Sequence, residues 1–223
     1  LKRSGYLEDL GLFMRPGIEL MWTGRAIVSP GYRASDLAAV RTVTGTVPVI
    51  WDNFYANDYC PGKIFLGPFT GRPAKGKSGL RRTTAGMMLN PTGLYHTDVF
   101  LVHVLGGFLR GLSPAAGWRK AVREMDVPRE FFTIAPLLAS PFAQLNLKEF
   151  TPARVKTLRA ALKPLIWEWK SPLQREWYPY LYALDGDLRL LEQGEAAPDE
   201  AWIRKKYSAI QAPLLLKAAA ARR

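Results

Sequence analysis

The chain has 223 residues, 48% hydrophobic and 22% charged, which is typical of a folded domain with or without an appendage and excludes wholesale disorder. One cysteine and two histidines exclude an internal disulfide framework and argue against a zinc site. The formal charge of +12 would suit nucleic acid, but the basic residues are spread over many segments, so we predict a solvated basic surface and no nucleic-acid partner.

Hydropathy and the first residues bear on location. No apolar run approaches the roughly 20 residues of a membrane span, so we predict no membrane partner. Residues 1–12 are typical of the end of an amphipathic helix, and the sequence starts without methionine. We therefore expect an N-terminal part of the protein to be missing, which leaves the compartment unknown, with the cytoplasm slightly favoured over secretion.

The first elements alternate between helix and strand. Apolar residues at helical spacing predict a helix over 6–13, which a Pro-Gly pair would end. The apolar run 18–22 predicts a buried strand. Ser35 then has the position of an N-cap for a short helix that Gly45 would close.

Two further strands follow along the chain. A β-branched apolar run predicts a strand over 47–51, and a second apolar run predicts one over 86–89. The loop between them is rich in glycine and proline, so we expect little helix there. A helix is predicted over 97–109, with apolar side chains on its buried side.

The spacing of the strand ends indicates the topology. Trp22, Trp51 and Asn90 recur at about the 30-residue spacing of a βαβ unit, so we predict an α/β fold with a parallel sheet. Three units fit the last part of a (β/α)8 TIM barrel or one half of a doubly wound sheet. No Gly-x-Gly-x-x-Gly follows the first strand, which argues against the dinucleotide-binding version. A whole barrel needs roughly 250 residues, so five units would lie upstream.

The composition changes after Gly111. Residues 1–111 carry the predicted strands and would form the C-terminal part of the barrel, and residues 112–223 would form an α-helical region. Tryptophans at helical spacing in the second part are expected to be core residues rather than a ligand platform. The predicted helices of this region span 114–125, 152–170, 172–193 and 198–220.

Polar and aromatic side chains follow the predicted strands. At the C-terminal ends of parallel strands, side chains reach the mouth where ligands bind. These positions hold Trp22, Trp51, Asp52, Asn53 and Asn90, with Asp58 in the following loop. An indole covers the C–H faces of a sugar while amides and carboxylates bind its hydroxyls, so we predict a sugar site. The alternative is an Asx-rich turn after a strand, although turns seldom bring tryptophan and tyrosine with them.

Catalytic groups are scarcer than binding groups. Hydrolysis of a glycosidic bond takes two carboxyl groups, or one plus a nucleophile supplied by the substrate. Asp52 and Asp58 are the acids of this region, but a loop of this length sets no distance between them, so we do not favour them as the catalytic pair. Cys60 is interpreted as a free thiol, because no neighbouring histidine or cysteine would activate it.

Four sequence blocks occur in a recognisable order. They are PGIELMWTG at 16–24, PVIWDN at 48–53 with ANDY at 56–59, FLGPF at 65–69 with GR at 71–72, and LNP at 89–91. Together they resemble glycoside hydrolase family 84, the β-N-acetylglucosaminidase family that includes the O-GlcNAcases, and the resemblance covers about residues 6–110. The helical region shows no such motif.

The resemblance implies a fold and a reaction. Family 84 has an eight-fold β/α barrel, and the blocks look like its strands six, seven and eight. The family removes terminal β-linked N-acetylglucosamine with retention and without metal or cofactor, using the sugar's own acetamide as nucleophile. An Asp-Asp pair at the end of strand four assists. No Asp-Asp dipeptide occurs in these 223 residues, so no catalytic residue is expected in this chain.

The resemblance also implies substrate-binding roles. By similarity, Trp51, Asp52 and Asn53 line the pocket for the sugar and its acetamide, Asp58 binds hydroxyls at the far side of the ring, and Asn90 contacts a hydroxyl. The expected partners are an N-acetylglucosamine-bearing glycan or glycoprotein and the missing N-terminal part of the same barrel. We expect the segment alone to be inactive.

Two other functions remain open. One is a non-catalytic N-acetylglucosamine-binding module or pseudoenzyme that keeps the binding residues without the catalytic pair. The other is a basic α/β protein associated with nucleic acid. This alternative would be dismissed if oligonucleotides were bound without sequence preference and the affinity were lost near physiological salt.

Overall fold

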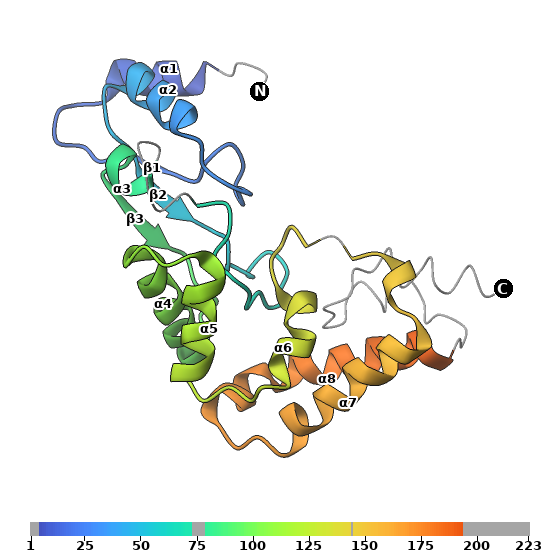
Figure 1. Cartoon of the computed structure of the whole chain (residues 1–223). Helices are drawn as coiled ribbons and strands as arrows, with labels where there is room; N and C mark the ends of the chain where they lie inside the picture. The colour runs from blue at the N-terminus through green and yellow to red at the C-terminus, as the bar shows by residue number, and fades with distance from the viewer. Residues whose placement is uncertain (1–4, 73–78, 144, 194–223) are drawn as a thin grey trace.

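Three short strands form one parallel sheet in the computed structural model, which describes residues 5–72, 79–143 and 145–193 (Figure 1). They are β1 (Met21–Trp22), β2 (Val49–Asp52) and β3 (Gly86–Leu89), in the order β1-β2-β3. The register pairs Met21 with Val49 and Trp22 with Ile50 in the first ladder, and Val49 with Gly86 through Asp52 with Leu89 in the second.

The parallel sheet confirms the predicted α/β class. Ile50 is fully buried at the centre of the sheet, as expected of a β-branched run in a parallel strand. Strand β1 is shorter than predicted, although Leu20 already accepts a hydrogen bond from the backbone N–H of Val49 at 2.9 Å. Within the described residues β1 and β3 each pair with one strand. Whether this sheet is part of an eight-stranded barrel stays a prediction.

Helices α1 (Tyr6–Phe13) and α2 (Ala34–Thr44) pack together beyond the β1 end of the sheet (Figure 1). Gly45 ends α2 in the left-handed region at φ 69°, as predicted. The N-cap prediction was wrong: the cap residue is Arg33, and Ser35 lies inside the first turn. The apolar side chains of α1 are not buried among the described residues, and Phe13 is 83% exposed.

In the described residues of the connection from β2 to β3, which omit 73–78, there is one short helix, α3 (Leu80–Thr83), in agreement with a loop of little helical content. After β3 the chain forms α4 (Tyr95–Leu109) and then α5 (Pro114–Glu124), which pack against each other. Their backbones approach closely at a glycine pair, because a Cβ added to Gly107 would lie 2.7 Å from the Cα of Gly117.

The helical region continues with short elements and two long helices. Helices α7 (Pro152–Trp167) and α8 (Pro172–Gln193) lie side by side and match two of the predicted helices (Figure 1). The Thr151 hydroxyl caps α7 by accepting from the Arg154 N–H at 3.3 Å. The predicted helix over 198–220 lies outside the described residues. Between α5 and α7 the described residues form α6 (Phe131–Ile134), η1 (Ala135–Leu138) and η2 (Leu147–Glu149).

One hydrophobic core runs from the sheet into the helical region. It reaches from Tyr32 to Leu191 and includes the fully buried Trp177. The Trp118 indole N–H donates to the Leu66 carbonyl at 2.7 Å, which joins α5 to the loop after β2. The predicted division at residue 111 stays a prediction, and the core extends across it. Within the described ranges, no helix has both the length and the apolar character needed to cross a bilayer.

Candidate functional site

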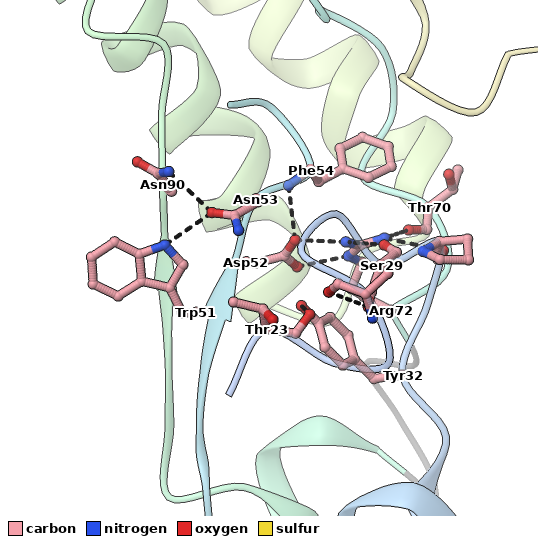
Figure 2. A network of polar contacts seen from close by, with 12 residues as sticks. Thr23, Ser29, Tyr32, Trp51, Asp52, Asn53, Phe54, Thr70, Arg72 and Asn90 are labelled. Atoms are coloured by element: carbon pink, nitrogen blue, oxygen red, sulfur yellow. Dashed lines mark hydrogen bonds and ion pairs between the residues drawn. The ribbon is translucent and has the colours of Figure 1, made fainter. Parts of the chain in front are cut away.

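Consecutive residues at the end of β2 point to opposite sides of the strand. Figure 2 shows Trp51, Asn53 and Asn90 on one side and Asp52 with Arg72 on the other. This division follows from the two-residue period of side chains along an extended chain. The polar end of β2 therefore carries two separate groups of side chains. We call Trp51, Asn53 and Asn90 the open group, and Asp52 with Arg72 the buried group.

The open group is tied together through the Asn53 side chain. Its Oδ1 accepts from the Trp51 indole Nε1 at 2.9 Å and from Asn90 Nδ2 at 3.0 Å, while its Nδ2 donates to the Ile27 carbonyl at 2.7 Å. The backbone N–H of Asn90 donates to the Asp52 carbonyl at 2.9 Å, which extends the β2–β3 ladder by one bond. Adjacent parallel strands thus place two asparagines and one indole together.

This group has the chemistry of a carbohydrate site. Trp51 and Asn90 are both partly accessible to solvent, whereas Asn53 is 7% exposed and holds the other two in place. The Asn90 carbonyl oxygen points away from Asn53 in Figure 2 and remains an acceptor for a hydroxyl donor. An indole surface beside an oriented amide can cover a sugar face and bind a hydroxyl at its edge.

The buried group is an ion pair between Asp52 and Arg72. Arg72 Nε donates to Asp52 Oδ2 at 2.7 Å and Nη2 donates to Oδ1 at 2.6 Å, and both side chains are inaccessible to solvent. The Phe54 N–H also donates to Asp52 Oδ1 at 3.0 Å. The two carboxylate oxygens therefore serve a bidentate pair. We find Asp52 facing the interior, so a direct contact with a sugar stays a prediction for this residue.

The same guanidinium also binds three backbone carbonyls from two further segments. It donates to the carbonyls of Ser29 at 3.0 Å, Pro30 at 3.2 Å and Thr70 at 2.9 Å. The loop after β1, the end of β2 and the loop after β2 thus converge on one side chain (Figure 2). We call the set Asp52, Arg72, Ser29, Pro30 and Thr70 the arginine clamp.

Aromatic rings surround the arginine clamp. The Arg72 guanidinium lies over the rings of Phe54 at 4.5 Å, Phe69 at 5.1 Å and Tyr32 at 5.2 Å, as cation–π contacts require. Burial, together with the Asp52 charge, raises the pKa of the Tyr32 phenol above its ordinary value. The Tyr32 hydroxyl donates to the Thr23 carbonyl at 3.2 Å, which ties the end of β1 to the clamp.

Sequence reasoning treated Arg72 only as part of a motif and missed its pairing with Asp52. The two are 20 residues apart across a loop rich in glycine and proline, and no spacing rule predicts such a contact. A signal existed in the residue types. A carboxylate that directly follows a buried strand needs a cation or several donors if it stays inside, and Arg72 is the basic residue of the neighbouring sequence block.

Asp58 lies apart from the open group. It is exposed in the loop after β2, where its Oδ1 accepts from the Tyr59 N–H at 3.0 Å. The preceding Asn57 is buried and donates to the Lys63 carbonyl at 3.0 Å, which closes this loop on itself. We call residues 57–63 the Asp58 loop. Among the described residues, no hydrogen bond connects Asp58 to Trp51, Asn53 or Asn90.

A cavity of about 120 Å³ lies beside the Asp58 loop. Burial raises the pKa of the Cys60 thiol, and burial also raises the pKa of the neighbouring Tyr59 phenol. Cys60 is a free thiol, as predicted. Across the described part of the chain, no group of three or more histidine, cysteine or acidic residues could hold a metal ion. The cavity is lined by Tyr59, Cys60, Lys63, Ile64, Phe65, Leu137, Ser140, Pro141, Ala143 and Leu145.

Comparison with known proteins identifies the family. The model of the family described as beta-N-acetylglucosaminidase matches residues 1–135, which is more than half of the chain. Protein O-GlcNAcase of Rattus norvegicus and that of Mus musculus are each 33% identical to this chain over 126 residues. The match covers 56% of this chain and 13% of each relative, so the chain spans a small part of their length. The family expected from the ordered sequence blocks is confirmed, and the chain belongs to the β-N-acetylglucosaminidase family of O-GlcNAcase-like proteins, glycoside hydrolase family 84.

Proposed function

We propose that this chain supplies the sugar-binding end of a retaining β-N-acetylglucosaminidase. The protein that contains it would hydrolyse terminal β-linked N-acetylglucosamine on glycoproteins or glycans. The observation that carries the proposal is the group formed by Trp51, Asn53 and Asn90 at the C-terminal ends of adjacent parallel strands. Family membership supports the glycosidase class, and the position of the group matches where ligands bind in α/β folds.

Each residue of the group has a distinct role in this proposal. Trp51 packs against the sugar, and Asn53 fixes the orientation of both Trp51 and Asn90 through its single carbonyl oxygen. Asn90 binds one hydroxyl, and Asp58 binds hydroxyls at the far side of the ring. Asp52 contributes by anchoring the strand end through Arg72.

The bond cleavage itself needs residues that this sequence lacks. In substrate-assisted hydrolysis the acetamide oxygen attacks the anomeric carbon while the glycosidic bond breaks and a general acid protonates the leaving oxygen. The resulting oxazoline is then opened by water, which gives up a proton to the same group acting as base. The adjacent aspartates that do this in the family have no counterpart here, because the sequence contains no Asp-Asp dipeptide. We propose that they lie in another part of the protein.

The fold proposal follows the same division. Strands β1, β2 and β3 would be the sixth, seventh and eighth strands of a (β/α)8 barrel, and the outer edges of β1 and β3 would pair with the remaining strands. The parallel order of the three strands and the helices between them support this placement.

The test is hydrolysis by the full-length protein that carries this sequence. A chromogenic N-acetyl-β-glucosaminide should be cleaved with the β-anomer as the first product by NMR. The corresponding β-glucoside is the matched control, and it should not be cleaved, because it lacks the acetamide nucleophile.

Equal cleavage of the two substrates, or an α-anomeric first product, would refute the substrate-assisted mechanism. A full-length protein that binds N-acetylglucosamine but cleaves neither substrate would instead identify the non-catalytic binding module. The substitution Asn53→Ala in the full-length protein tests whether the open group takes part in hydrolysis, since it removes the acceptor for both Trp51 and Asn90.

A further inference from the structure

Helix α8 contacts the Asp58 loop and the start of α4, the helix that follows the loop carrying Asn90. The contacts come from three residues within one turn, Glu176, Trp177 and Tyr180. We call this set the α8 turn. Its side chains reach the start of α4, which follows Asn90, and the Asp58 loop.

The first contact is an unusual cap on α4. The residue at the N-cap position, Leu94, has no capping side chain, so the first N–H groups of α4 need another acceptor. Glu176 supplies it: its carboxylate accepts from His96 N–H at 2.9 Å, from Thr97 N–H at 2.7 Å and from the Thr97 hydroxyl at 2.7 Å. An acceptor with a negative charge is favoured at this end of a helix.

Trp177 adds further contacts between α8 and the start of α4. It is fully buried, and its indole N–H donates to the Thr97 hydroxyl at 3.0 Å. Its ring packs edge-on against Phe100 of α4 at 5.6 Å and lies 5.1 Å from Phe131. Thr97 itself is fully buried, so its hydroxyl is held by one donor and one acceptor of α8 without competition from water.

The start of α4 in turn holds the loop that carries Asn90. Asp98 accepts from the Thr92 N–H at 2.9 Å, the Thr92 hydroxyl at 2.7 Å and the Gly93 N–H at 3.1 Å. The path from α8 to Asn90 therefore runs through Thr97 and Asp98, which are adjacent in α4, and then two residues of the loop.

The second contact is with the Asp58 loop. Asn57 precedes Asp58, and its side-chain Nδ2 donates to the Tyr180 hydroxyl at 3.4 Å as well as to the Lys63 carbonyl. Asn57 and Tyr180 are both buried, at 7% and 8% exposure. The residue that closes the Asp58 loop is thus also the one that contacts α8.

We propose that the α8 turn is a positioning element of the sugar site, which holds the Asp58 loop and the loop that carries Asn90 (residues 90–94) at a fixed separation. This inference rests on the proposed function. It assigns the helical region a part in sugar recognition, because Asp58 and Asn90 come from separate loops and the α8 turn contacts the structure behind each. Glu176, Trp177 and Tyr180 touch no substrate in this account, and they act through Thr97 and Asn57.

The test compares Glu176→Gln and Tyr180→Phe with Tyr182→Phe in the full-length protein. Tyr182 is the matched control, since it lies on the same helix, is 51% exposed and stacks on Tyr178. We expect each α8-turn variant to raise KM about three- to tenfold, the loss of one hydrogen bond, with a smaller change in kcat. Tyr182→Phe should leave both unchanged.

A second readout separates positioning from a general loss of folded protein. The preference for an N-acetylglucosaminide over its 4-epimer, an N-acetylgalactosaminide, depends on where the hydroxyl-binding residues stand. We expect the α8-turn variants to reduce this preference, whereas a smaller folded fraction would lower both rates equally. A mutant with unchanged KM and unchanged preference would overturn the inference.

Amide hydrogen exchange keeps the inference testable if the proposed function fails. Glu176→Gln should speed exchange at His96 and Thr97, and Tyr180→Phe should speed it in the Asp58 loop, relative to Tyr182→Phe. Exchange equal to that of Tyr182→Phe would overturn the inference. Absence of sugar binding and hydrolysis in the unmodified protein would overturn the proposed function, and the exchange rates would still decide whether α8 holds the two loops.

Discussion

Replacing Arg72 by methionine would remove the cation from an ion pair that no solvent reaches. Methionine keeps much of the side-chain length, so the main effect is electrostatic. The Asp52 carboxylate would remain buried with one hydrogen bond, from the Phe54 N–H. Breaking a buried pair in this way costs about 3–5 kcal/mol of folding free energy. The Ser29, Pro30 and Thr70 carbonyls would also lose a donor, at about 0.5–1.5 kcal/mol each where water does not replace it.

Urea unfolding of the full-length protein, followed by tryptophan fluorescence, measures this loss as a lower unfolding midpoint. Arg72→Lys should lie between the wild type and Arg72→Met, because lysine keeps the charge but not the two-pronged geometry. Arg25→Met is the matched control. Arg25 pairs with Asp36 at the surface, where its side chain is 54% exposed, so we expect little change.

A loss in Arg72→Met no larger than that in Arg25→Met would refute the role of the arginine clamp. The double variant Arg72→Met with Asp52→Leu sharpens the test, since it removes the uncompensated charge together with its partner. We expect it to recover part of the stability lost in the single variant. No recovery would mean that the loss comes from the three carbonyls and from packing, not from the carboxylate.

Three further predictions concern the surroundings of the clamp. Asp58→Ala and Asn90→Ala should each lower kcat/KM of the full-length enzyme by a factor that corresponds to about 1–3 kcal/mol of lost transition-state binding. Asp58→Ala should have little effect on the unfolding midpoint, because Asp58 is exposed. Unchanged kinetics would remove both residues from the site. Gly67→Ala should lower the unfolding midpoint clearly, since its Cβ would lie 2.3 Å from the Ala139 carbonyl oxygen, and an unchanged midpoint would contradict this contact. Burial raises the pKa of the Cys60 thiol, so its alkylation at pH 8.5 should be slower in the folded protein than in urea. The contribution of the protonated thiol to the free energy of unfolding should be present at neutral pH and decline as pH rises through the raised pKa.

The local part of the fold followed from residue types. The β-branched run before Trp51 predicts a buried strand, and Gly45 predicts a helix end, because both signals act within a few residues. The N-cap at Ser35 failed since a serine inside the first turn has the same local signature as one that precedes it. The proximity of Trp51, Asn53 and Asn90 was also predictable from the sequence, because parallel strands bring their C-terminal ends to one edge of the sheet.

The long-range contacts were beyond such signals. Asn57 and Tyr180 are 123 residues apart, and Glu176 reaches across 80 residues to cap a helix with no cap of its own. These partners are chosen by how α8 packs on the core, which depends on all the buried side chains together. The pairing of Asp52 with Arg72 was missed for a related reason, since a carboxylate suits a sugar as well as it suits an arginine.

The alternation at the end of β2 limits how this segment can change in length. Inserting or deleting one residue between Val49 and Asn53 would exchange the two sides of the strand, turning an indole toward Arg72 and a carboxylate toward solvent. A single event of this kind would destroy the open group and the arginine clamp together. Among family members we therefore expect insertions and deletions to be confined to the connecting loops, while this short stretch keeps a constant length.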